Sequence, residues 1–73
     1  MTQNEMVLDH LRKKPITQYD ALREYGIMRL ASRISDLRAE GHKITTTTET
    51  IKNRYGKKVS HAVYTLRKEA DNG

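Results

Sequence analysis

The chain of 73 residues contains no cysteine, tryptophan or phenylalanine, a single proline and only four glycines. Without cysteine it can form neither a disulfide framework nor a thiolate metal site, which is typical of a reducing compartment such as the cytoplasm. Residues 1–25 hold no apolar run long enough for a signal peptide or a membrane span. We therefore expect a soluble intracellular chain forming one domain over residues 1–73, with a frayed tail at 68–73.

Residues that commonly catalyse reactions or bind metals are scattered along this chain. His10, His42 and His61 do not have the spacing of metal ligands. The sequence also contains no glycine-rich phosphate loop, no nucleophile motif and no recognisable carboxylate pair. We therefore expect no enzyme activity, no metal, no cofactor, no small-molecule ligand and no membrane contact.

Positive charge is confined to two segments of the chain, which carries a formal net charge of +5. Residues 1–26 are balanced, with four basic and four acidic side chains. Residues 27–43 hold four basic side chains against two acidic ones, and residues 51–58 hold four with no acid. This segregation predicts a polyanionic partner that contacts these two segments.

Apolar periodicity and flanking residues predict two helices in the first third of the chain. The first, at about residues 3–13, begins with a capping box formed by Thr2 and Glu5. The second, at about residues 18–25, has Thr17 as its N-cap. Its inward side is expected to consist of Ala21, Leu22 and Tyr25.

A third helix, at about residues 28–40, is expected to follow Gly26 directly, so that it forms a helix-turn-helix with the second. Its buried stripe consists of Leu30, Ile34 and Leu37. The remaining positions carry small residues with charged residues toward the edges, namely Met28, Arg29, Ser32, Arg33, Ser35, Asp36, Arg38 and Ala39. Alone, such a helix is most often simply solvated, with an i, i+3 ion pair. The helix-turn-helix context favours entry into the major groove of DNA instead.

Within this third helix, Arg29, Ser32, Arg33, Asp36 and Arg38 are the candidate DNA contacts. Serine lets the backbone approach a groove closely, and arginine can hold phosphate or bind guanine through two hydrogen bonds. The sequence leaves open whether Asp36 pairs with Arg33 or accepts a hydrogen bond from a cytosine.

Two strands at about residues 43–51 and 57–66 follow, because their threonine and valine content favours extended backbone. Asn53 and Gly56 between them suit a hairpin turn, which predicts a wing over residues 43–66. The cations near its tip repel one another unless a polyanion neutralises them. Lysines that protect a strand edge from aggregation are the alternative explanation. The candidate DNA contacts of the wing are Lys52, Arg54, Lys57 and Lys58.

The start of the second helix is a further candidate contact. Free N–H groups and the helix dipole attract phosphate there, which makes Gln18 a candidate DNA contact. For its neighbour Thr17, simple helix capping explains the residue equally well.

Residues 16–66 resemble the small winged helix-turn-helix domains common in phage and prophage genomes. The resemblance is carried by ITQYDALREYGI for the first helix of the motif and its turn, RLASRISDLRAEGHKI for the recognition helix, and YGKKVSHAVYTL for the returning wing strand. It implies an α+β fold of three helices followed by a two-stranded β-hairpin wing. It also implies DNA binding through the third helix and the wing, in a phage transcriptional regulator or an excisionase-like recombination accessory factor.

The expected partner is double-stranded DNA, in the cytoplasm of a bacterial host and associated with the nucleoid. One module of this size offers a limited interface, so we expect a homodimer or cooperative assembly on DNA. Candidate contacts between copies are Met6, Ile51 and Val59. Two other hypotheses are a module that binds and inhibits a host or phage protein, and a module that binds RNA.

Overall fold

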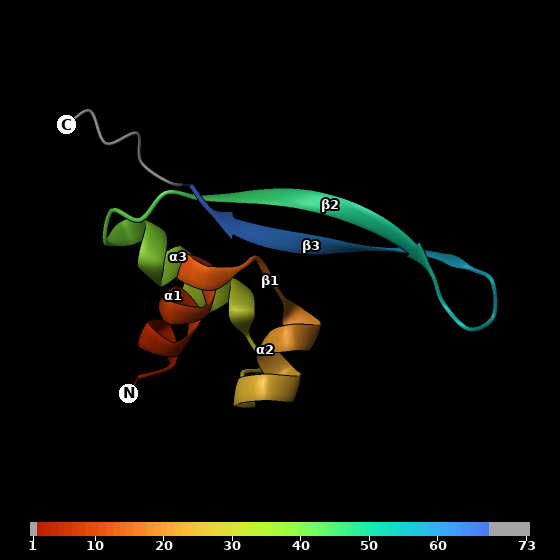
Figure 1. Cartoon of the computed structure of the whole chain (residues 1–73), viewed down its shortest axis with the longest axis horizontal. Coiled ribbons are helices and arrows are strands. Elements are labelled where there is room, and N and C mark those ends of the chain that lie inside the picture. Colours follow the sequence, from red (N-terminus) through yellow and green to blue (C-terminus); the bar gives the residue numbers. More distant parts are fainter. Residues whose placement is uncertain (1, 68–73) are drawn as a thin grey trace.

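The computed structural model describes residues 2–67, which form three helices and three strands (Figure 1). The helices gather in one body, and a hairpin runs across this body and projects beyond it. The expected α+β arrangement of three helices and a hairpin is confirmed, and the tail at 68–73 lies outside the described residues. The bounds are α1 Gln3–Lys13, β1 Ile16–Thr17, α2 Gln18–Tyr25, α3 Leu30–Ala39, β2 Ile44–Lys52 and β3 Lys58–Leu66.

The first two helices each begin with a capping box. Thr2 Oγ1 accepts a hydrogen bond from the Glu5 N–H at 3.1 Å, and Glu5 Oε1 accepts one from the Thr2 N–H at 2.8 Å. Hydrogen bonds from Thr2, first of all from its backbone N–H, lower the pKa of Glu5. Thr17 and Asp20 form the same reciprocal pair of bonds, at 3.1 and 3.2 Å. The start of both helices is therefore determined by local sequence.

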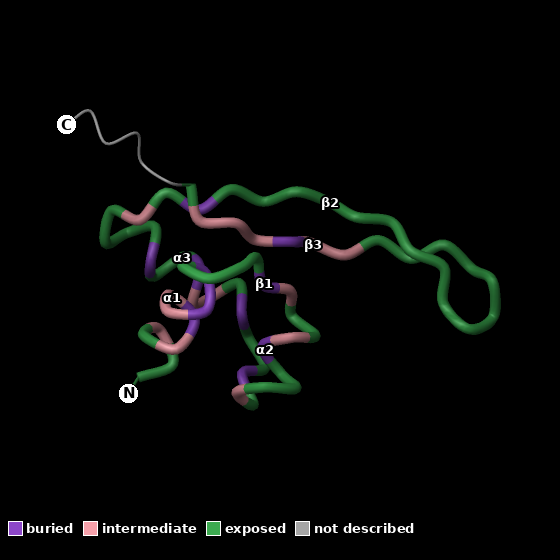
Figure 2. Tube along the Cα trace, in the orientation of Figure 1, coloured by how far each residue is buried: buried purple, intermediate pink, exposed green. Residues whose placement is uncertain are grey.

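The hydrophobic core lies between the three helices and the base of the sheet (Figure 2). The predicted stripe of α3 is fully inside it, with each of its three side chains at most 1% exposed. Burial of apolar surface on this scale is the main stabilising term for a small domain. The core consists of Val7, Leu11, Ile16, Ala21, Ile27, Leu30, Ile34, Leu37 and Ile44.

The prediction that Leu22 lies on the inward side of α2 is wrong, since this side chain is 51% exposed. Only Ala21 is buried on α2, and Tyr25, four residues later on the same side of the helix, packs against the core. Leu22 is rotated by about 100° from Ala21 on the helix, which turns it toward solvent.

The sheet includes a short strand that the sequence pattern does not reveal. β1 pairs antiparallel with β3, with Ile16 opposite Tyr64 and Thr17 opposite Val63, so the strand order is β1-β3-β2. The sequence predicts only the two strands of the wing, because two residues are too few to show alternation. The extra strand connects the chain just before α2 to the hairpin.

The turn between α2 and α3 is longer than predicted. Gly26 has the expected left-handed backbone, with φ of 68°. The sequence predicts a helix from about residue 28 directly after it, whereas α3 begins at Leu30. Ile27 is 1% exposed, and its N–H donates to the Ala21 carbonyl at 3.1 Å. The chain therefore anchors Ile27 in the core before the next helix begins.

The β2–β3 hairpin is paired over nine residues of each strand, from Ile44 opposite Leu66 to Lys52 opposite Lys58. Its base packs on the helices, and most of its projecting part is exposed (Figure 2). The molecule is therefore elongated, with principal extents of 48 × 28 × 19 Å.

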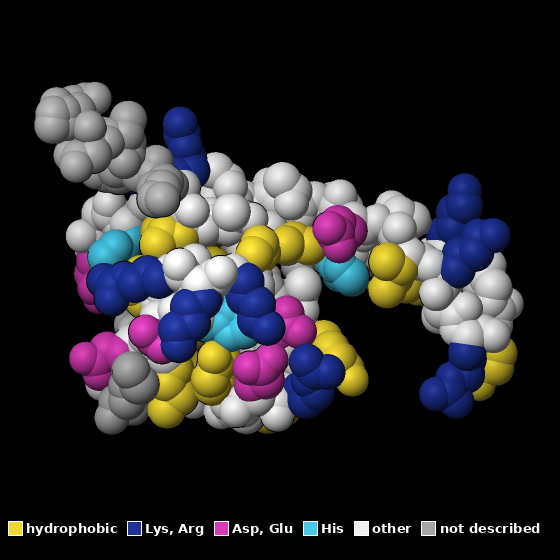
Figure 3. All heavy atoms as spheres, in the orientation of Figure 1, with side chains coloured by type: hydrophobic (Ala, Val, Ile, Leu, Met, Phe, Trp, Pro, Cys, Tyr) yellow, Lys and Arg dark blue, Asp and Glu magenta, His cyan; other side chains and the backbone are white. Residues whose placement is uncertain are grey.

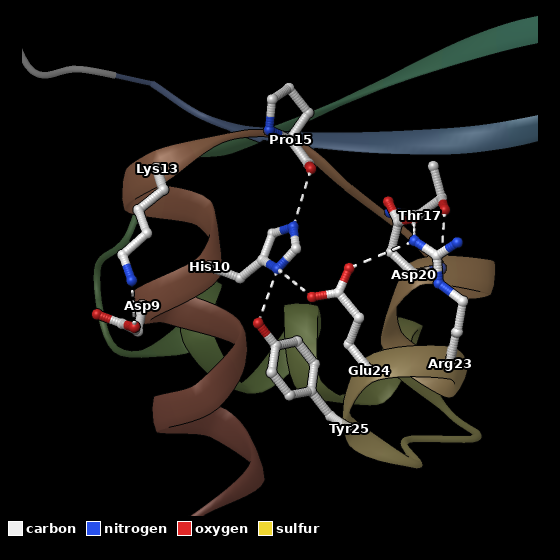
Figure 4. A network of polar contacts seen from close by, with 9 residues as sticks. All are labelled: Asp9, His10, Lys13, Pro15, Thr17, Asp20, Arg23, Glu24 and Tyr25. Atoms are coloured by element: carbon white, nitrogen blue, oxygen red, sulfur yellow. Dashed lines mark hydrogen bonds and ion pairs between the residues drawn. The ribbon is translucent and has the colours of Figure 1, made fainter.

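A buried histidine connects α1 to α2 and to the chain before β1 (Figure 4). His10 is 3% exposed, with Nε2 3.2 Å from the Pro15 carbonyl oxygen and Nδ1 2.8 Å from the Tyr25 hydroxyl. Because a carbonyl only accepts hydrogen bonds, Nε2 donates to it; in a neutral ring the Tyr25 hydroxyl then donates to Nδ1. Burial, together with the nearby Glu24 carboxylate, raises the pKa of Tyr25 above its ordinary value.

Candidate nucleic-acid interface

Three of the predicted contacts, Arg29, Ser32 and Arg33, line one hollow at the start of α3. The hollow has a volume of about 380 Å³ and is also bordered by Gln3 of α1 and by Met28, which is 78% exposed. Arg29 is the N-cap of α3, although its side chain makes no capping hydrogen bond with the described residues. The structure thus brings two cations and a small hydroxyl residue together on an accessible surface.

Asp36 is held toward α1. Its Oδ2 lies 3.3 Å from Arg33 Nη2 and accepts a hydrogen bond from Asn4 Nδ2 at 3.4 Å. The structure therefore contains the Arg33–Asp36 pair, which is one of the two alternatives that the sequence leaves open for Asp36. An i, i+3 pair exposed to this extent contributes only a few tenths of a kcal/mol, about 0.2–0.5. A ligand that offers either partner a better contact can therefore replace it.

Gln18 contacts the chain that leads into α3. Its Nε2 donates to the Ile27 carbonyl at 2.7 Å, and its Oε1 accepts from the Leu30 N–H at 2.9 Å. It thereby satisfies one of the N–H groups at the start of α3 that have no partner within the helix. Sequence reasoning missed this role, because twelve residues separate Gln18 from Leu30 and no local motif connects them.

The hairpin tip presents a separate group of cations. Figure 3 shows Lys and Arg side chains at the far end of the hairpin, apart from those over the helical body. Lys52 lies directly opposite Lys58 in the register, and both are exposed. Like charges in a cross-strand pair destabilise a sheet. Arg54 and Lys57 of the connecting turn are exposed as well.

Asn53 shapes the turn that carries these cations. Its Oδ1 accepts hydrogen bonds from the N–H groups of Tyr55, at 2.9 Å, and Lys57, at 3.1 Å. Gly56 has a left-handed φ of 78°, which suits glycine. The Tyr55 ring is 78% exposed. The tip is therefore an ordered loop built to point charged and aromatic side chains outward.

A family model described as a winged helix-turn-helix domain matches residues 2–69. The chain belongs to this family. Comparison with curated proteins and with solved structures gives no match. A winged helix-turn-helix domain is typically a non-enzymatic module that binds DNA, and DNA binding is therefore the general function of this chain.

In this winged helix-turn-helix domain, Arg38 ties the recognition helix α3 to the base of the wing. Its Nε and Nη2 donate to the Ile44 carbonyl at 3.0 and 2.8 Å, and Nη2 also donates to Thr46 Oγ1 at 2.8 Å. The sequence places Arg38 at one edge of the outward side of α3 but does not reveal these partners. The structure therefore separates Arg38 from the hollow that holds Arg29 and Arg33.

Two further observations concern residues 2–67 of this domain. No helix among them is long and apolar enough to cross a membrane. No group of three or more histidine, aspartate or glutamate side chains is placed to hold a metal ion within that range.

Proposed function

We propose that this winged helix-turn-helix domain binds double-stranded DNA in a sequence-specific manner, with α3 in the major groove and the wing on the flanking backbone. The observation that carries the proposal is the presence of accessible cations both at the start of α3 and, apart from them, at the hairpin tip. Cations at the start of a helix with small outward residues suit a major groove, and cations at the tip of a projecting hairpin suit the neighbouring phosphates.

Within α3, Arg29 and Arg33 are the proposed base or phosphate contacts, and Ser32 gives the backbone room to approach. Asp36 either keeps Arg33 in position or exchanges that pair for a cytosine amino group. Arg38 holds the wing to the helix and has a secondary role on DNA. Gln18 is proposed to orient α3 through its two hydrogen bonds. It is also proposed to contact a DNA phosphate at the start of α2.

On the wing, Arg54 is the proposed inserting side chain, with Lys52, Lys57 and Lys58 on phosphates. The repulsion within the cross-strand pair of Lys52 and Lys58 supports this role, because a bound phosphate removes it.

The biological role is proposed to be that of a small phage-type protein, either a transcriptional regulator or an excisionase-like recombination accessory factor, acting on the nucleoid in the host cytoplasm. Assembly of two or more copies on DNA is part of this proposal. Ile51 and Val59 lie opposite each other on the hairpin and are 49% and 40% exposed, which supports contact between copies there. Met6 is only partly exposed on α1 and is the weaker candidate.

The test is a salt titration of binding to duplexes selected from a random pool. For several phosphate contacts, the logarithm of affinity should fall against the logarithm of salt with a slope of about −4 to −6. Arg29→Gln and Arg54→Gln should each weaken binding and reduce the slope by about 1. The matched control is Arg23→Gln, because Arg23 on α2 pairs with Asp20 and Glu24. Undetectable duplex binding at micromolar protein would overturn the proposal.

A hollow between α2 and the hairpin favours protein binding as the second candidate function. Its volume is about 550 Å³, and the described residues around it include exposed Tyr19 and Ile51 with the acidic Asp20 and Glu49, and no Lys or Arg. Such a surface suits a protein with apolar and basic side chains better than DNA. If duplex binding fails while Tyr19→Ala abolishes capture of a host protein, this function replaces the first. Preference for structured RNA in the same titration would indicate RNA binding.

A further inference from the structure

A third hollow lies where α1 and α3 end, and neither the recognition helix nor the wing accounts for it. Its volume is about 380 Å³. Arg12 comes from α1, His42 and Lys43 from the connection between α3 and β2, and Arg67 from the residue after β3. Leu8 and Leu66 line it as apolar residues. Among the described residues that line it, none is acidic.

We call the line along which α1 packs against α3 the α1–α3 seam. This hollow lies on that seam, as does the hollow that holds Arg29 and Arg33. At the start of the seam, Gln3 and Ser32 line the same hollow, and the next residue of α1, Asn4, donates a hydrogen bond to Asp36. At its end, Arg12 and His42 line the third hollow together. The two helices therefore advance in the same direction, and the nine residues from Gln3 to Arg12 span about 14 Å at 1.5 Å each. One DNA strand carries about four phosphates over that axial length, at 3.4 Å per charge.

Neutralisation of helix ends explains only part of the charge at this hollow. Two helix C-termini contribute about one negative charge together, at about half a charge each. Glu40 adds another, since its Oε1 lies 3.9 Å from His42 Nε2. Against these stand the three permanent cations Arg12, Lys43 and Arg67. This end of the seam therefore stays positive even before His42 is counted.

We propose that this hollow, defined by Arg12, Lys43 and Arg67, is a phosphate-binding site that extends the DNA interface along the α1–α3 seam. The inference rests on the proposed function. Two guanidinium groups can each bind a phosphodiester through paired N–H donors, and the Lys43 ammonium adds a point charge. The Arg67 N–H donates to the Lys43 carbonyl at 2.7 Å, so the backbones of these two residues are already held together.

The experiment compares the triple variant Arg12→Gln, Lys43→Gln, Arg67→Gln with wild type in the duplex titration. The triple variant should bind about ten-fold more weakly at moderate salt, and its log–log slope should be smaller by about 2 to 3. Each single variant should show a smaller change in the same direction, which keeps the test valid if the triple variant fails to fold. Lys13→Gln is the control, because Lys13 is on the same helix, 3.4 Å from Asp9, and does not line the hollow. Its slope should match that of wild type.

A second readout separates DNA phosphate from a free anion. The Gly41 amide resonance, at the edge of the hollow, should shift on addition of duplex and not on addition of inorganic phosphate at equal phosphate concentration. A shift of this resonance on addition of inorganic phosphate but not of duplex would overturn the DNA contact and indicate a small-anion site. If wild type binds duplex and the variants keep its slope, the phosphate site is wrong and the proposed function stands. If wild type binds no duplex, the proposed function itself fails.

Discussion

Gln18 joins the two helices of the helix-turn-helix through a single side chain. Its amide donates to the Ile27 carbonyl and accepts from the Leu30 N–H, with both bonds shorter than 3 Å. Only a side chain that has both a donor and an acceptor at this length can make the two contacts. The direction in which α3 leaves the turn, and hence the position of Arg29, depends on this amide.

We expect Gln18→Met to lower the free energy of unfolding by about 1–3 kcal/mol, because it leaves two backbone groups without their partner. Gln18→Glu keeps an acceptor for Leu30 but places a carboxylate against the Ile27 carbonyl, so it should be at least as destabilising. Urea denaturation measures both. Leu22→Ala on the exposed side of the same helix should change stability by less than about 0.5 kcal/mol. Unchanged stability of Gln18→Met with lost DNA affinity would indicate a direct phosphate contact instead.

Helical periodicity was sufficient to place individual side chains on the inside or the outside of α3. It predicted the buried stripe of Leu30, Ile34 and Leu37, because one face of a helix repeats every three to four residues. It could not predict that Arg38 bonds the Ile44 carbonyl, or that Asn4 bonds Asp36. Such partners depend on how elements pack together, which no local pattern encodes.

At the scale of elements, the wing was predictable and the strand it pairs with was not. The run of threonines and the turn residues Asn53 and Gly56 indicated a hairpin, since β-branched residues favour extended backbone. β1 exists only because Ile16 and Thr17 meet β3 after the fold has formed. Its pairing anchors the base of the wing on the side away from β2.

The turn of the wing should be ordered before DNA arrives, because Asn53 holds it. Asn53→Ala removes both hydrogen bonds from its side chain and should lower the free energy of unfolding by about 1 kcal/mol or less, since the tip is exposed. DNA affinity should fall about three- to ten-fold, because the loosened loop must be ordered on binding. Denaturation and duplex titration measure the two effects. Thr50→Ala on the nearby strand is the control, and equal loss of affinity in both variants would contradict a specific role for Asn53.

Across the whole molecule, cations gather at three places, which are the start of α3, the hairpin tip and the end of the α1–α3 seam. The order of residues in the sequence does not reveal all three. The sequence indicated the α3 segment and the wing, because each is a continuous run with excess positive charge. It could not indicate the end of the α1–α3 seam, where Arg12 and Arg67 come from opposite ends of the chain. Folding alone brings them to one hollow. Charge runs in the sequence alone therefore indicate a smaller interface than the one proposed from the folded chain.

This concentration of charge predicts that salt acts on stability and on DNA binding with opposite signs. Between about 0.05 and 0.5 M salt, screening should raise the free energy of unfolding by up to about 1 kcal/mol, because like charges such as Lys52 and Lys58 repel less. Over the same range, duplex affinity should fall by a factor of about 10⁴ or more, since counterions compete for phosphates. Urea denaturation and duplex titration in matched buffers measure the two trends.

The variant Lys58→Gln isolates the repulsive part of this effect. It removes the cross-strand charge pair, so it should be more stable than wild type by about 0.2–1 kcal/mol at low salt and equal to it at high salt. Its duplex affinity should nevertheless be lower at low salt, because it also loses one phosphate contact. A wild-type stability that falls with salt would show that attractive pairs such as Arg33–Asp36 outweigh the repulsion at the tip. The same cations of the wing thus lower the stability of the free protein and strengthen its binding to DNA. This is expected of a surface selected for binding a polyanion rather than for stability of the free protein.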